Sequence, residues 1–320
     1  MKTIQAITAM MLAYLALTAC NKEEFPPDRT TPDGNGNAIR ITATMGDFTG
    51  NSPDTRATID EASGTGSFEK GDQILVYATP YASTSDLFRT ATFDGTSWEC
   101  DTPLQWSDLP EDENGKGYSF IGYYPVLTTT PDTDNNIVFT VESDQSTQAA
   151  YAASELMMSI ARVERGKDVK FIFHHFMARI LVTLTAGEGV TQEVVKTATV
   201  RIKNMRVNLQ VDLRRRSISA PPDPVYADIT PLPSTTLPGT FYAIVPLFQT
   251  LAAGRIEVTV DGQTITYQVP DNDDLEFYQG GTTRVNLTLK RATPSPDSKS
   301  ATTIGELEQN NHQSYKLLKR

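Results

Sequence analysis

The stretch RIEVTVDGQTITYQV, residues 255–269, decides the fold class of this chain. Asp261-Gly262 supplies the two positive φ angles of a type I′ hairpin turn. The register set by this turn places Val258 opposite Ile265. Apolar residues then share one face and polar residues the other; the apolar ones are Ile256, Val258, Ile265 and Tyr267. This alternation predicts a sheet that is packed on one side and solvated on the other.

Similar β-rich runs recur along most of the chain, with turn-rich segments between them. They lie at residues 39–45, 73–78, 87–93, 118–124, 136–141, 169–184, 197–202, 207–213, 240–248, 255–260, 264–269 and 283–289. Only the segment 146–158 has a weak helical pattern. Many short strands with little helix predict an all-β protein built of β-sandwiches. Because the long run ends at Leu184, we expect one sandwich at 38–187 and a second at 188–320, the latter with a polar tail.

A second hairpin is expected at Asp94-Gly95. The same two-residue turn would place Ala91 opposite Trp98, with Cys100 on the same face. This position favours a buried core thiol for Cys100 over a reactive or paired one.

The first residues have the layout of a bacterial lipoprotein leader. Lys2 is followed by an apolar run that is too short to span a membrane. Leu17-Thr18-Ala19-Cys20 then reads as a cleavage site, which predicts a signal peptide at 1–19, cleavage between Ala19 and Cys20, and lipid on Cys20. An ordinary or stray thiol is the alternative. Acyl chains on Cys20 would hold the protein on the outer membrane without a spanning helix.

The segment that follows is polar. Residues 20–37 are rich in Pro, Gly, Asn, Asp and Thr, which predicts a flexible tether. Lys22-Glu23-Glu24 resembles a signal that sends some lipoproteins to the outer face of the outer membrane; a merely solvated charge run is the alternative.

The charge balance is acidic, with 28 Lys and Arg against 39 Asp and Glu. Phosphate binding depends on clustered basic residues, so nucleic acid is not expected as a partner. The one basic run, Arg214-Arg215-Arg216, is expected at a solvated strand end or turn.

No motif for catalysis or cofactor binding is found, so neither enzyme activity nor a cofactor is expected. His174 and His175 are neighbours in one run and point to opposite faces, so they cannot hold one metal together; we expect core or interface histidines. The acidic loops 132–136 and 271–274 leave calcium as an alternative, but they lack the spacing of known calcium loops.

Several segments, in this order, resemble the fimbrillin family, the lipoprotein subunits of type V pili. They are RATID, FEKGDQILVYA, YSFIGYYP, YAASELM (151–157), Phe173-x-His175-x-Met177-Ala178-Arg179-Ile180, FYAIVPLF and LEFYQGGTTRVNLTL. The resemblance implies two tandem transthyretin-like β-sandwiches in a surface lipoprotein. It also implies assembly in which a protease cuts after an Arg beyond the first strand and another subunit donates a strand to the freed groove.

The resemblance carries over to particular residues here. The first strand would be IRITATM (39–45), with Ile39, Ile41, Ala43 and Met45 on one face. The cut would fall between Arg56 and Ala57, in a loop that suits a protease; an uncleaved surface Arg56 is the alternative. At the other end Leu307 stands where the family often has tryptophan, and NHQSYKLLKR is polar and basic. Such a subunit could accept a strand without donating one, which suits a tip or accessory position.

The sequence leaves three functions to be compared. We expect a structural or tip subunit of a fimbrium that supports cell adhesion, with other fimbrial subunits and a host or bacterial surface receptor as partners. The alternative is a non-polymerising surface lipoprotein that binds glycan or protein through aromatic residues such as Tyr123, Tyr124 or Trp106. A hydrolase is disfavoured because no catalytic set is found.

Overall fold

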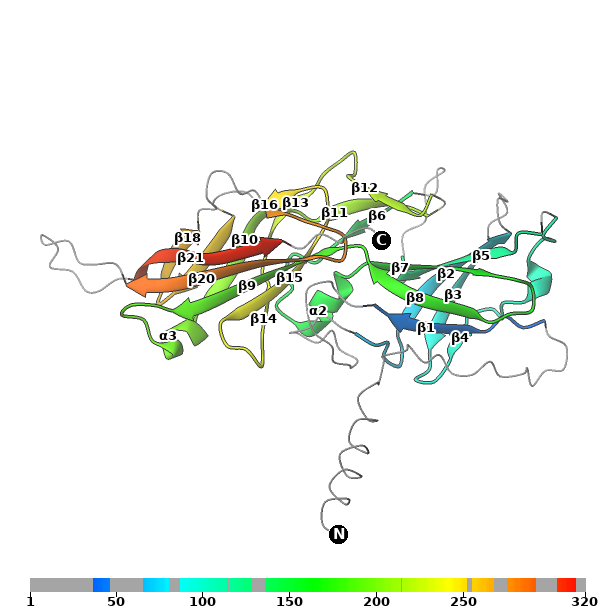
Figure 1. The fold of residues 1–320 in the computed structure, drawn as a ribbon, viewed down its shortest axis with the longest axis horizontal. Helices are drawn as coiled ribbons and strands as arrows, with labels where there is room; N and C mark the ends of the chain where they lie inside the picture. Colours follow the sequence, from blue (N-terminus) through cyan, green and yellow to red (C-terminus); the bar gives the residue numbers. More distant parts are fainter. Residues whose placement is uncertain are drawn as a thin grey trace, which may run out of the picture. The chain divides into compact units, whose positions relative to one another are not determined.

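The computed structural model describes residues 37–46, 66–80, 87–113, 115–127, 136–213, 215–251, 255–267, 275–291 and 304–314. This part of the chain is mostly β-structure in several sheets, with few and short helices (Figure 1). None of its helices has the length and apolar character needed to cross a membrane. The predicted β-class is therefore confirmed.

One sheet has seven strands in the order β1-β8-β7-β5-β2-β3-β4. Their bounds are β1 (Ile41–Met45), β8 (Val169–His175), β7 (Met157–Val163), β5 (Tyr118–Tyr124), β2 (Gln73–Pro80), β3 (Leu87–Phe93) and β4 (Trp98–Cys100). All neighbours are antiparallel except β1 and β8, which are parallel. The sheet nearly closes, because Ala38 ahead of β1 forms a bridge with Gln105 beyond β4.

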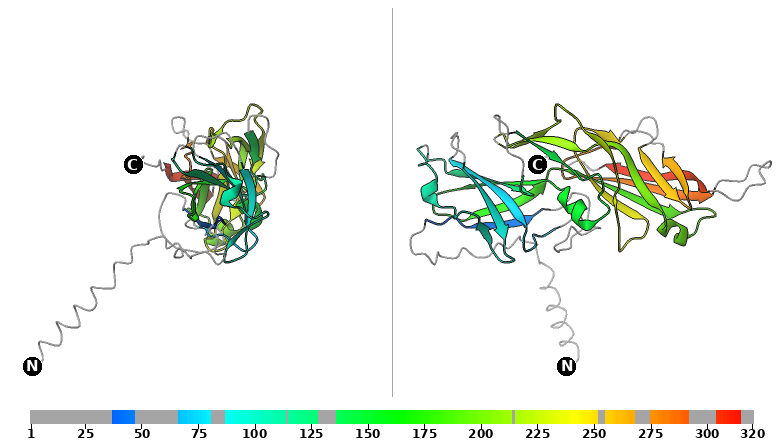
Figure 2. Two further views of the ribbon diagram at one scale, coloured as in Figure 1. Left: turned by 90° about the vertical axis from the view of Figure 1, so that its right-hand side faces the viewer. Right: turned by 180° about the vertical axis from the view of Figure 1, so that it is seen from behind.

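The other strands of the described residues form four further sheets. The five-stranded sheet contains β14 (Leu232–Pro233), β15 (Thr240–Val245), β9 (Ala178–Ala186), β20 (Thr282–Arg291) and β21 (Ile304–Ser314). The four-stranded sheet contains β13 (Tyr226–Ile229), β10 (Thr199–Arg206), β17 (Ile256–Val260) and β18 (Gln263–Tyr267). The smaller sheets contain β12 (Ser217–Ser219), β11 (Asn208–Asp212) and β6 (Asn136–Thr140), and β16 (Thr250–Leu251) with β19 (Leu275–Glu276). Figure 2 shows the strands from two further sides.

Within the described residues three short helices connect the strands: η1 (Trp106–Asp108), α2 (Gln148–Ala153) and α3 (Gln192–Lys196). The side chain of Thr147 accepts a hydrogen bond from the amide of Ala150 and so caps the start of α2. The helix predicted at 146–158 is too long, because α2 ends at Ala153 and β7 already begins at Met157. The helix α3 was not predicted from the sequence.

The Asp261-Gly262 hairpin is confirmed in its register, with Val258 opposite Ile265. Both turn residues have positive φ, 49° and 73°. The register predicted for the second hairpin is wrong, because Phe93 rather than Ala91 faces Trp98.

The physical reason lies in the turn of that second hairpin. The carboxylate of Asp94 accepts hydrogen bonds from the amides of Thr96 and Ser97, each at 2.7 Å. These bonds shape a four-residue loop in place of a two-residue turn. Ala91 then faces Cys100, a shift of two that leaves the predicted face unchanged.

The long run 169–184 is two strands rather than one. β8 ends at His175, and β9 begins at Ala178 in the five-stranded sheet. β9 pairs with β15 and β20, which both lie beyond residue 188, so the strand pairing does not follow a division at 187/188. That division as a domain boundary stays a prediction. Phe176 and Met177, which connect the two strands, are buried.

The last strand, β21, reaches into the polar C-terminal segment as far as Ser314. It pairs antiparallel with β20 and lies at the edge of the five-stranded sheet. The predicted polar tail therefore contributes backbone to the fold in its first half.

Candidate functional site

The strand β1 lies at the edge of the seven-stranded sheet and, among the described strands, pairs only with β8 (Figure 1). The parallel ladder pairs Ile41 with Val169 and Met45 with Phe173. At its two ends the amide of Val169 donates to the carbonyl of Arg40 at 2.8 Å, and the amide of Gly46 donates to the carbonyl of Phe173 at 2.7 Å. Loss of β1 would leave one side of β8 with unpaired backbone groups.

One face of β1 packs on the core, as predicted. Ile39 and Ile41 are buried, and Ala43 and Met45 pack against the same cluster. On β8 this cluster contains Val169, Phe171 and Phe173, all fully buried. The strand that covers β8 therefore contributes apolar side chains as well as backbone hydrogen bonds.

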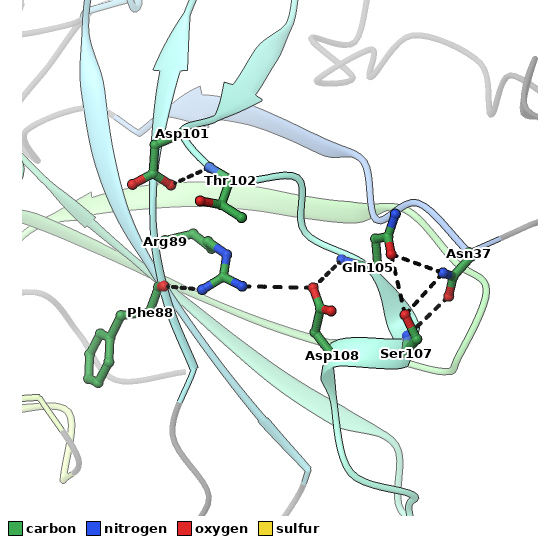
Figure 3. Close-up of polar contacts among 8 residues, drawn as sticks. All are labelled: Asn37, Phe88, Arg89, Asp101, Thr102, Gln105, Ser107 and Asp108. Atoms are coloured by element: carbon green, nitrogen blue, oxygen red, sulfur yellow. Dashed lines mark hydrogen bonds and ion pairs between the residues drawn. The ribbon is translucent and has the colours of Figure 1, made fainter.

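A polar clasp holds the chain just ahead of β1 (Figure 3). We use this name for Asn37, Gln105 and Ser107. The Asn37 side-chain Nδ2 donates to Gln105 Oε1 at 3.3 Å and to Ser107 Oγ at 3.1 Å, and its Oδ1 accepts from the Ser107 amide at 3.0 Å. The carbonyl of Asn37 accepts from the Trp106 amide at 2.8 Å. Asn37 was predicted to belong to the flexible tether. In the structure it is hydrogen-bonded to Gln105 and Ser107.

The loop side of the clasp has support of its own. Asp108 Oδ2 accepts from the amide of Gln105 at 3.0 Å and lies 3.8 Å from Arg89 Nη2 (Figure 3). Arg165 donates from Nη1 to the carbonyl of Trp106 at 2.7 Å and from Nη2 to the hydroxyl of Tyr118 at 2.6 Å. These contacts come from strands of the seven-stranded sheet other than β1 and from the loop after β7, so they do not depend on β1.

A second polar cluster lies where the chain passes from β8 to β9. His175 Nδ1 is 3.0 Å from Glu155 Oε1, and both side chains are buried. Beside them the buried Arg179 donates from Nε to Thr282 Oγ1 at 3.1 Å, and its guanidinium lies 5.8 Å from the ring centre of Tyr242. These residues come from four of the segments quoted in the sequence analysis, so those segments meet in space.

Burial also changes the pKa of Tyr151, a further member of this cluster. The Tyr151 side chain is fully enclosed, and desolvation raises the pKa of its hydroxyl above the ordinary value of a tyrosine. A buried histidine is what the sequence analysis expected at position 175. His174 is exposed, so it is not a core histidine, and an interface role there stays a prediction.

Two cavities are lined by His175, one of about 540 Å³ and one of about 350 Å³. Met158, Ile160, Lys170 and His174 line the larger, which also reaches Gly280. Within the described residues no group of three His, Cys, Asp or Glu side chains could hold a metal ion. Of the acidic loops 132–136 and 271–274, only Asn136 belongs to the described residues, where it begins β6.

The remaining predicted site residues have different outcomes. Ala19, Cys20, Arg56 and Ala57 all lie outside the described residues. Cys100 is partly buried, and desolvation followed by the charge of Asp101 raises the pKa of its thiol to about 11. Arg215 and Arg216 lie in a turn, as expected.

The aromatic residues named for the glycan-binding alternative are mostly covered. Tyr123 and Trp106 are buried, and Tyr123 donates its hydroxyl to the carbonyl of Leu213 at 3.0 Å. Tyr124 is partly buried and donates to Asp72 Oδ1 at 3.3 Å. Stacking on a sugar ring needs an exposed ring face, which Tyr123 and Trp106 do not offer.

Comparison with solved structures gives the same fold at low sequence identity. A candidate cell adhesion protein from Bacteroides uniformis aligns with a TM-score of 0.58 and 18% identity, covering 88% of this chain and 100% of the other. A second candidate cell adhesion protein, from Bacteroides ovatus, aligns with a TM-score of 0.56 and 15% identity over 88% of this chain and 99% of the other. The tip fimbrial protein Mfa3 from Porphyromonas gingivalis is more distant, with a TM-score of 0.42 and 9% identity over 81% and 96% of the two chains.

No curated protein matches the sequence significantly. The model of the fimbrillin-like family matches residues 55–306. This match confirms the resemblance drawn from the quoted segments, and the family is not an enzyme family. Since the matched region makes up more than half of the chain, the protein belongs to the fimbrillin-like family.

Proposed function

We propose that this protein is a surface-exposed lipoprotein of a fimbrium, a structural subunit or a tip or accessory component, that supports cell adhesion. Membership of the fimbrillin-like family supports this function, and the similar structures include candidate cell adhesion proteins. Its body would consist of two tandem transthyretin-like β-sandwiches. A signal peptide at 1–19 and lipid on Cys20 would first anchor it in the outer membrane.

Assembly would proceed by strand exchange triggered by a protease. A cut between Arg56 and Ala57 separates β1 from the rest of the chain, because β1 precedes this bond in the sequence. The observation that carries the proposal is the position of β1 as an edge strand over the buried residues Val169, Phe171 and Phe173. A strand from another subunit would restore both the hydrogen bonds and the apolar cover.

The strand at the opposite end offers a candidate donor. β21 is the edge strand of the five-stranded sheet and, among the described strands, forms a ladder with β20 alone. If β21 left the sheet, its ladder with β20 would break and the other ladders of the sheet would stay intact. Whether this chain donates as well as accepts decides between a repeating subunit and a tip or accessory position.

Surface filaments isolated from cells test the proposal. Strand-exchanged polymers resist dissociation, so we expect ladders of this polypeptide on a gel after mild heating. N-terminal sequencing of the surface form should begin at Ala57. A surface form that is entirely monomeric and acylated on Cys20 would favour the alternative of a non-polymerising surface lipoprotein that binds glycan or protein.

A further inference from the structure

We propose that the loop Gln105–Ser107 is a subsite that binds a carboxamide side chain carried just ahead of whichever strand occupies the β1 position. In the uncut chain Asn37 fills this subsite (Figure 3). In the assembled form an incoming strand would supply its own asparagine. The inference rests on the proposed strand exchange and names a polar feature that the donor strand must carry.

The contacts around Asn37 distinguish a carboxamide from other side chains. One end of the group accepts a hydrogen bond from the Ser107 amide, and the other end donates to Gln105 Oε1 and Ser107 Oγ. An alanine makes none of these bonds, and a carboxylate would need the Gln105 amide and the Ser107 hydroxyl to act as donors instead. The subsite therefore favours asparagine over an apolar side chain.

Backbone contacts fix the distance between the carboxamide and the apolar residues. The Trp106 amide donates to the carbonyl of Asn37, and the amide of Ile39 donates to the carbonyl of Leu104 at 2.9 Å. Ile39 and Ile41 then enter the core. The acceptor should thus recognise Asn-x-Ile-x-Ile or a close aliphatic equivalent, in a strand that runs parallel to β8.

The subsite should persist after β1 leaves. Asp108 and Arg89 hold one side of the loop, and Arg165 holds the carbonyl of Trp106. A binding site that is already formed loses less conformational entropy when its ligand arrives. The polar loop can therefore contribute to affinity as well as to register.

The most suitable occupant is a strand from another subunit. In this chain's own C-terminal strand, Asn310 and Asn311 are not followed by two aliphatic residues at alternate positions. The occupant is therefore a different subunit whose donor strand carries this spacing, and the chain's own segment 37–45 shows the required pattern. The peptide GNAIRITATMG, residues 36–46, is therefore a defined probe.

The test uses the full chain with a specific protease site in place of residues 51–56. After cutting, the two fragments are unfolded and refolded together with an equimolar amount of the fluorescently labelled peptide 36–46. Refolding lets the peptide compete with the chain's own segment, so a slow release of β1 cannot hide binding. Peptide retained on the folded protein is measured by size-exclusion chromatography, and its Kd by competition.

We expect the unmodified peptide to replace about half of the chain's own segment and the Asn37→Ala peptide to bind about tenfold more weakly, which corresponds to about 1.4 kcal/mol. The control is a Thr42→Val peptide, which should bind at least as well, because the Thr42 hydroxyl is buried and has no hydrogen-bond partner among the described residues.

A double variant of the acceptor, Gln105→Ala with Ser107→Ala, removes both acceptors of Asn37 Nδ2 but keeps the Ser107 amide that donates to Oδ1. The preference for the unmodified peptide over the Asn37→Ala peptide should therefore fall from about tenfold to about threefold. Equal binding of these two peptides to the unmodified acceptor would overturn the subsite and leave strand exchange standing. Failure of every peptide to bind would instead overturn the strand exchange on which the subsite rests.

Discussion

The side-chain amide of Gln145 hydrogen-bonds to both backbone groups of Ile244: Nε2 donates to the carbonyl at 2.9 Å, and Oε1 accepts from the amide at 2.8 Å. Gln145 is fully buried. Ile244 lies near the end of β15, beyond the residues that pair with β14. A single side chain therefore takes the place of a neighbouring strand at this edge.

Replacement of Gln145 by alanine should destabilise the protein by about 2–4 kcal/mol, because it leaves two buried backbone groups of Ile244 without partners. The matched control is Gln148→Ala, three positions along the chain. Gln148 Nε2 is buried but has no partner in the described part of the chain, so its loss should change little. Urea unfolding followed by tryptophan fluorescence compares the two, and equal losses would contradict the assignment.

The buried pair of Glu155 and His175 should be sensitive to the loss of either partner. Glu155→Ala and His175→Ala should each cost about 3–5 kcal/mol, since the remaining polar group stays buried without its partner. The double variant should cost clearly less than the sum of the two. A sum that is strictly additive in the unfolding free energy would show that the two residues do not interact.

An exposed ion pair provides the comparison for the single and double variants of Glu155 and His175. Glu193 and Lys196 lie 2.6 Å apart on the surface of α3. Exposed pairs are weakened by water and by salt. Glu193→Ala should leave the denaturation midpoint unchanged, while the variants at 155 and 175 lower it.

Gly122 should not tolerate a side chain. A Cβ atom there would lie 2.6 Å from the Phe173 ring, which is fully buried and cannot move into solvent. Gly122→Ala should therefore cost about 1–3 kcal/mol through overpacking. Thermal unfolding measures this cost. The compensating variant is Gly122→Ala with Phe173→Leu, which should be no less stable than Phe173→Leu alone.

Thiol chemistry at Cys100 should be slow near neutral pH. Burial raises its pKa to about 11, against 9.0 for a free thiol, so at pH 8 the thiolate should be about 100-fold scarcer than in a peptide. Iodoacetamide labelling of a Cys20→Ser protein measures this difference. The labelling rate should continue to rise up to about pH 11.

The same pKa shift sets the sign of a stability effect. The unfolded thiol loses its proton near pH 9, and the folded one near pH 11, so the folded state holds more protons between these values. The free energy of unfolding should therefore fall as the pH rises through this range. Cys100→Ser should remove this part of the pH dependence; an unchanged slope would contradict it.

Local patterns predicted the strands well where the turn between them was specified by backbone geometry. Asp261-Gly262 fixed its hairpin in the correct register, because both turn residues need positive φ. At Asp94 a side-chain hydrogen bond lengthened the loop, which the same two-letter pattern does not reveal. The run 169–184 is uniformly apolar and β-rich, so nothing in its periodicity marks the passage from β8 to β9.

The candidate site was predictable only in its apolar half. Alternation within 39–45 gave the face of β1 that packs on the core. The clasp joins Asn37 to Gln105 and Ser107, which are far apart in sequence, and no local pattern links them. From sequence alone, an asparagine within a polar segment is assigned to a tether. Its hydrogen-bond partners can be identified only in the folded structure.

The passage from β8 to β9 has a mechanical consequence. Only Phe176 and Met177 separate a strand of one sheet from the centre of another, where β9 is flanked by β15 and β20. Tension that enters through β8 would pass along the covalent backbone into β9 and load two ladders in shear, so that many hydrogen bonds would have to break together.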